Sequence, residues 1–92
     1  MKPLNREEYD KIFNECREIS IIKNNDYGCD TMLKFSEKGL VIRMNDKMER
    51  LINLIWNETE QKVSDEKIED TAKDMINYSI YLVQMKRGKL IE

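Results

Sequence analysis

Apolar side chains recur every three or four residues along most of the chain, which is the spacing of one face of an α-helix. The first run predicts a helix over residues 6–23, with Asn5 as its N-cap and Glu8 placed as in a capping box. The stretch 24–28, rich in Asn and Asp and ending in Gly28, predicts a break. The apolar face of this first helix comprises Tyr9, Ile12, Phe13, Cys16 and Ile19.

Three more helices follow from the same pattern. A short helix is expected over residues 30–37, with Gly39 as its stop, and a long one over residues 40–58. Residues 59–64 are predicted to form a loop, and Ser64 is expected to be the N-cap of the last helix. This helix runs to about Arg87, with Gly88 as its stop. Three long helices and one short helix predict an all-α fold, a small antiparallel helical bundle.

The length of 92 residues is typical of a single domain, here residues 1–92. A chain this short buries only about 60–65% of its unfolded surface. Charged residues make up 37% and apolar residues 40%, which suits amphipathic helices with solvated outer faces. Because the core is limited, we expect the bundle to be completed by homo-oligomerisation, as a dimer or higher oligomer.

The charge and the residue types limit the chemistry. A net charge of −2 gives no basic footprint for duplex nucleic acid, although it permits a small phosphorylated ligand. The sequence has no His and only two Cys, so a metal held by carboxylates, such as Mg²⁺, is the expected kind. No long apolar run predicts a signal peptide or membrane span, so no membrane partner and a cytoplasmic location are expected.

The last helix carries the first candidate site. Asp70, Asp74, Tyr78 and Tyr81 are spaced by four, four and three residues and therefore share one face. Two carboxylates one turn apart repel each other, and a bound divalent cation would remove that cost. The same spacing also fits a solvated acidic face with lysines nearby.

The third helix and the break at residues 24–28 carry two further candidates. Cations beside carboxylates on the third helix could hold a triphosphate and its metal, or could form ordinary i,i+4 ion pairs. In the break, the aromatic ring of Tyr27, next to Asp26, could stack on a base, or could simply cover the edge of the core. The charged residues of the third helix are Arg43, Asp46, Lys47, Glu49 and Arg50.

Several short motifs together resemble a known family. They are the run from Lys23 to Gly28, then Gly39, then Arg43-x-x-Asp46–Lys47-x-x-Arg50–Leu51, then Ser64–Asp65–Glu66-x-x-x-Asp70–Thr71-x-x-Asp74-x-x-x-Tyr78. Their order resembles the first type of the phage nucleotide modification associated domain family, and more distantly the MazG-like all-α NTP pyrophosphatases. The resemblance covers about residues 20 to 82.

The resemblance implies a nucleotide ligand, Mg²⁺, a role in nucleotide metabolism, and a phage or prophage origin. It assigns Asp46, Asp70 and Asp74 as catalytic residues, with Glu49 joining them as metal ligands. Thr71 stands where the MazG-like motif has its first acid, and Asp70 is one position away. The implied ligand-binding residues are Asp26, Tyr27, Arg43, Lys47, Arg50 and Tyr78.

Three functions remain open from the sequence. In the first, a Mg²⁺-dependent enzyme cleaves a nucleotide α–β phosphoanhydride, with the carboxylates holding the metal and the cations neutralising charge. In the second, a non-catalytic sponge sequesters a nucleotide immune signal, and the cations and tyrosines matter more than the carboxylates. In the third, the chain is a helical protein-interaction module that uses Met44, Met48 and Trp56.

Overall fold

The computed structural model describes residues 2–27, 30–57 and 64–90, and the side chains in these ranges apart from 26, 27, 30–33, 35 and 64. Every regular element in this part of the chain is helical, so the predicted all-α class is confirmed. The elements are α1 (Arg6–Tyr27), α2 (Asp30–Leu51), a π-helical turn η1 (Ile52–Trp56) and α3 (Ser64–Lys86).

The helix α1 begins where the sequence predicts. The side-chain oxygen of Asn5 accepts a hydrogen bond of 3.0 Å from the backbone N–H of Glu8, which confirms Asn5 as the N-cap. The predicted break after residue 23 is wrong, because α1 continues to Tyr27. Asn and Asp cost well under 1 kcal/mol each relative to Ala inside a helix, and adding residues to an existing helix is favourable, so α1 can extend through them.

The helix α2 contains a kink that divides it into a short first part and a long second part. The kink lies at Ser36, whose φ of 58° and ψ of −160° are not helical. Glu37 is the first residue of the second part, and its N–H donates a hydrogen bond of 2.6 Å to the side-chain oxygen of Ser36. A division into a short and a long segment was expected, but the stop predicted at Gly39 is wrong, because Gly39 lies inside the second part.

The helix α3 ends in a Schellman motif. The N–H of Gly88 bonds to the carbonyl of Met85 and the N–H of Lys89 bonds to that of Gln84, at 3.0 and 2.8 Å. Gly88 has a φ of +64°, which confirms it as the stop. Ser64 opens α3, but its predicted capping side chain and most of the predicted loop lie outside the described residues.

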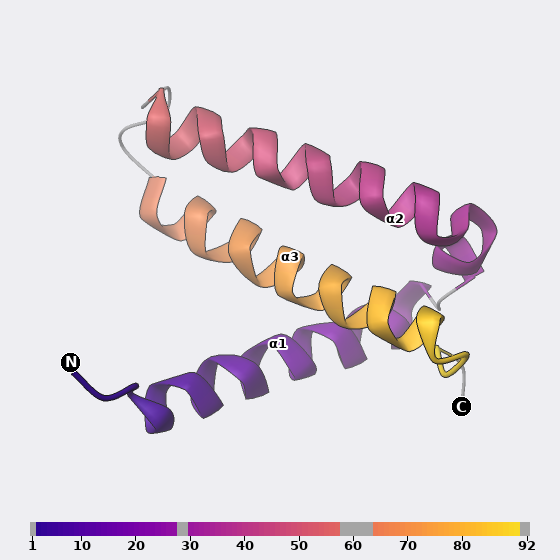
Figure 1. Ribbon diagram of the computed structural model, residues 1–92, viewed down its shortest axis with the longest axis horizontal. Helices are drawn as coiled ribbons and strands as arrows, with labels where there is room; N and C mark the ends of the chain where they lie inside the picture. Colours follow the sequence, from indigo (N-terminus) through magenta and orange to yellow (C-terminus); the bar gives the residue numbers. More distant parts are fainter. Residues whose placement is uncertain (1, 28–29, 58–63, 91–92) are drawn as a thin grey trace.

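The helix α3 lies between the other two helices, with α1 on one side and α2 on the other (Figure 1). The long part of α2 runs antiparallel to α3, whereas α1 and α3 run in the same direction. Among the described residues, the buried apolar side chains are only Cys16, Leu40 and Leu54. None of the described helices is both long and apolar enough to cross a membrane.

Candidate functional site

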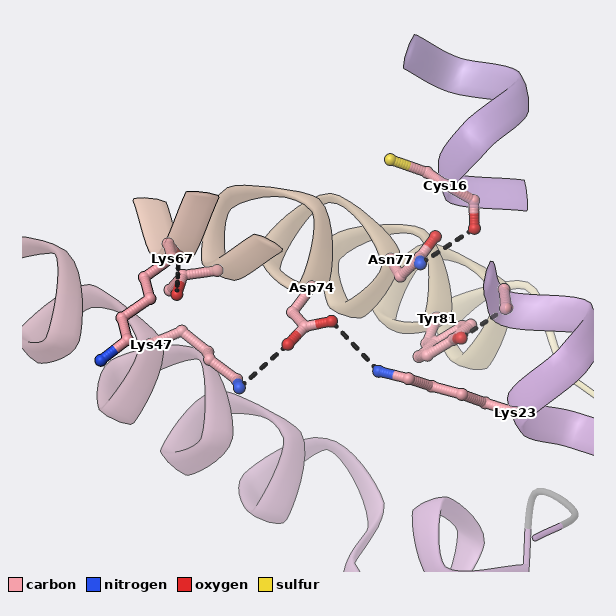
Figure 2. Close-up of polar contacts among 9 residues, drawn as sticks. Cys16, Lys23, Lys47, Lys67, Asp74, Asn77 and Tyr81 are labelled. Atoms are coloured by element: carbon pink, nitrogen blue, oxygen red, sulfur yellow. Dashed lines mark hydrogen bonds and ion pairs between the residues drawn. The ribbon is translucent and has the colours of Figure 1, made fainter. Parts of the chain in front are cut away.

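Asp74 of α3 lies between two lysines that come from the two flanking helices. Its carboxylate is 3.2 Å from the ammonium of Lys23 on α1 and 3.0 Å from that of Lys47 on α2 (Figure 2). We call Lys23, Lys47 and Asp74 the lysine–aspartate cluster. It is a place where side chains of all three helices meet, and its three members belong to three separate sequence motifs.

The cluster is half-buried, and this determines its electrostatics. The side chain of Asp74 is 21% exposed, that of Lys47 is 29% exposed and that of Lys23 is 55% exposed. Burial alone would raise the pKa of Asp74, but the hydrogen bonds from Lys47 and Lys23 and the positive charges of these lysines together outweigh it and lower the pKa below its ordinary value. Asp74 is therefore charged at neutral pH, and the cluster carries a net charge of about +1.

Contacts between α1 and α3 hold Lys23 in reach of Asp74. The buried side chain of Asn77 donates a hydrogen bond of 3.0 Å to the backbone carbonyl of Cys16, and the hydroxyl groups of Ser20 and Tyr81 are hydrogen-bonded (Figure 2). Lys23 follows Cys16 by seven residues, or about two helical turns, so both lie on the same face of α1. The packing of α1 on α3 thus presents Lys23 to the cluster.

Two tyrosines of α3 adjoin the cluster. Tyr78 follows Asp74 by one helical turn, and its ring centroid lies 6.3 Å from that of Tyr81, with the planes tilted by 55°. Both side chains are half-buried. The predicted ligand-binding residue Tyr78 therefore lies one turn along α3 from the carboxylate that contacts both cations, and it is partly exposed.

The structure does not bring the four predicted metal ligands together. Asp46, Glu49 and Asp70 are exposed, whereas Asp74 is held by two lysines. Among the described residues, no three carboxylate or thiol groups lie close enough to share a metal ion. A Mg²⁺ ion at Asp74 would also face two ammonium groups, so the side chains described here do not fit the metal that the resemblance implies.

The remaining predicted ligand-binding residues do not join the lysine–aspartate cluster through any contact between described side chains. Arg43 and Arg50 are exposed on α2 and form no ion pair within the described part of the chain. Asp26 and Tyr27 belong to the last turn of α1, but their side chains lie outside the described residues. Lys23 was not proposed as a ligand-binding residue. Its seven-residue spacing from Cys16, a residue of the predicted apolar face, is the signal that could have identified it.

A second polar cluster joins α1 to α3 on another part of the surface. The ammonium of Lys73 is 3.0 Å from Glu15 of α1 and 3.1 Å from Glu69 of its own helix. Hydrogen bonds to Glu15 and then Glu69 raise the pKa of Lys73 well above its ordinary value, so it stays charged. It lines a shallow surface depression whose other lining residues come from α1. Two carboxylates surround one ammonium, so this cluster carries no net positive charge, and its ion pair with Glu15 joins α1 to α3.

No family model, curated protein or solved structure matches this chain. The family resemblance therefore remains a prediction from the motifs, and the lysine–aspartate cluster is the structural feature that bears on function.

Proposed function

We propose that the chain binds a nucleotide, or a closely related phosphorylated ligand, at the lysine–aspartate cluster without a metal and without cleaving it. The observation that supports this proposal is the pair of lysines held on either side of one half-buried carboxylate. Of the functions predicted from the sequence, this is the sponge, in which cations rather than carboxylates hold the ligand.

The charges and the hydrogen-bond donors of the cluster suit a phosphate group. Each ammonium has three N–H donors, and one contact to Asp74 leaves donors on Lys23 and Lys47 for other acceptors. Lysine ammonium groups are common phosphate ligands that act as point charges. Asp74 keeps both cations at one place while the ligand is absent, which limits the ordering cost of binding.

The neighbouring aromatic side chains suit the rest of a nucleotide. Tyr78 lies one turn from Asp74, and stacking of a base on an aromatic ring contributes about 1–3 kcal/mol. Arg43 and Arg50 are exposed cations on the helix that carries Lys47, available to further phosphates.

In this proposal the protein works where nucleotides are abundant, in the cytoplasm, and it acts in nucleotide metabolism by controlling the concentration of the free ligand.

Isothermal titration with ATP in the presence of EDTA tests the proposal. We expect binding, and we expect Lys47→Gln and Lys23→Gln each to weaken it about tenfold or more, since a hydrogen bond to a charged group contributes about 1.5–3 kcal/mol. Lys86→Gln is the matched control, because Lys86 also joins α3 to α2 through an exposed ion pair, with Glu37 at 3.2 Å. That variant should bind like the unmodified protein.

The fate of the ligand separates binding from hydrolysis. After incubation with ATP and Mg²⁺, denaturation of the protein should release ATP intact, as measured by chromatography. Release of pyrophosphate that stops with EDTA would instead support the metal-dependent enzyme and contradict this proposal. Equal affinity in the Lys47→Gln and unmodified proteins would show that the cluster is not the binding site.

A further inference from the structure

One flank of α2 and of the π-helical turn η1 that continues it carries an uncharged, largely apolar stripe that no described element covers. Val41, Met48 and Ile55 recur at intervals of seven residues, and Ile52 follows Met48 by four. Their side chains are 54%, 45%, 55% and 44% exposed in that order. We call these four residues the α2 stripe. Spacing of three or four residues that repeats every seven is typical of a helix that packs along another helix.

The whole chain exposes more surface than a compact monomer of its size. Its accessible surface is 7725 Å², whereas a monomeric protein of 11.1 kDa exposes about 5,700 Å². The radius of gyration is 14.8 Å, against about 12.3 Å for a compact chain of this length. The excess of about 2,000 Å² exceeds the roughly 800 Å² that each partner buries in a standard stable interface.

The distribution of charge on α2 indicates what covers the stripe. The stripe has no charged side chain, and the position between Val41 and Met48 on the same flank is Asn45. A twofold interface places the same patch of two copies face to face, which an uncharged patch tolerates. The other flank carries Arg43 and Arg50, whose charges would repel their equivalents in a second copy.

We propose that a second copy of this chain packs on the α2 stripe and forms a twofold dimer. The two α2 helices lie side by side in this dimer, each stripe covering the other. In Figure 1, α2 lies at one edge of the molecule with α3 on one side only, so a second copy has access to it. Lys47 of the lysine–aspartate cluster contacts α3 and lies about 100° around α2 from Met48, outside the stripe, so this inference does not depend on the proposed function.

Sedimentation analysis of the purified protein over a dilution series tests the dimer. We expect a mass twice the 11.1 kDa of one chain, falling to a single chain in Met48→Glu. Ile42→Glu is the matched control, because Ile42 is 62% exposed on the same helix but lies about 100° around it from Val41. This control should remain dimeric.

Circular dichroism establishes that each variant is folded, and Ile55→Glu replaces Met48→Glu if the latter loses its helical signal. An unmodified protein that sediments as a single chain at every concentration overturns the proposal. So does a dimer that survives both stripe substitutions, or one that only Ile42→Glu dissociates. Titration of the monomeric variant with ATP gives a separate readout of the proposed function.

Discussion

Lys47 of α2 and Asp74 of α3 form an ion pair of 3.0 Å, although the sequence motifs that contain them suggest separate parts of a metal-dependent site. The lysine occupies the carboxylate that a metal would need. Lys23 of α1 contacts the other oxygen of the same carboxylate, at 3.2 Å. The role of Asp74 that follows from these contacts is to position two cations, and a substitution can separate this role from that of a metal ligand.

Asp74→Asn should destabilise the fold and strengthen ligand binding. Loss of the charged partner of two lysines should cost about 1–3 kcal/mol in the free energy of unfolding, measured by urea denaturation. The amide oxygen of Asn still accepts a hydrogen bond from a lysine, so part of the positioning is retained. Removal of the negative charge about 4 Å from a bound phosphate gains about 1 kcal/mol, or about fivefold in affinity, measured by titration with ATP in EDTA. A metal site would give the opposite result, because the variant would then lose binding.

The stability of the protein should fall in acid partly because of Asp74. Burial raises its pKa, the lysines lower it by more, and the folded-state pKa therefore lies below the ordinary value of about 3.9. A depressed carboxyl pKa stabilises the fold above pH 4, and this contribution is lost as the pH falls through the folded-state pKa.

Urea unfolding of the unmodified protein and of Asp74→Asn between about pH 2 and pH 6 measures this contribution. The two proteins should differ most at pH 6 and converge at the acid end. A constant difference across the range would mean that Asp74 does not titrate with a lowered pKa in the folded state.

The ends of helices were predictable from the sequence where a single residue determines the local backbone conformation or caps the helix. Asn5 caps α1 because its side chain reaches the N–H of Glu8, and Gly88 ends α3 because its φ is positive. Both effects act within a few residues, so the sequence contains all the information they require. The helix α1 passes through residues 24–27 despite their turn preference, because such preferences are weak and an existing helix extends readily.

The lysine–aspartate cluster could be predicted only in part. The spacing placed Asp74 and Tyr78 on one face of the last helix, and Lys47 was recognised as a candidate ligand-binding residue. What the pattern could not give was the pairing of these residues across helices, which depends on how α1 and α2 pack on α3. Lys23 therefore became a candidate only when the contact between α1 and α3 was known.

Asn77 should contribute to the attachment of α1 through one buried hydrogen bond. Its side chain is 5% exposed and donates to the carbonyl of Cys16 at 3.0 Å. Asn77→Ala should lower the free energy of unfolding by about 1–3 kcal/mol, measured by thermal or urea denaturation. Asn77→Asp should cost more, because it places a carboxylate against a carbonyl oxygen. Ser79→Ala, an exposed position on the same helix, is the control and should change little.

Cys16 should be unreactive while the protein is folded. Its side chain is fully buried, and burial raises the pKa of the thiol, so both access and the thiolate fraction are low. In a Cys29→Ser background, the rate of reaction with a thiol reagent at neutral pH should be far slower for the native than for the urea-unfolded protein. Equal rates would show that α1 separates readily from α3.

Gly88→Ala tests how strongly the end of α3 depends on one backbone angle. An added Cβ meets no atom within 4 Å, so the cost comes from the φ of +64° alone. For a residue with a Cβ, this conformation costs about 1–2 kcal/mol. Thermal unfolding should therefore show a loss of about that size, or fraying of the last turn in hydrogen exchange. Arg87→Ala, one position earlier and with no positive φ, should leave both measurements unchanged, and an equal loss in the two variants would contradict the assignment.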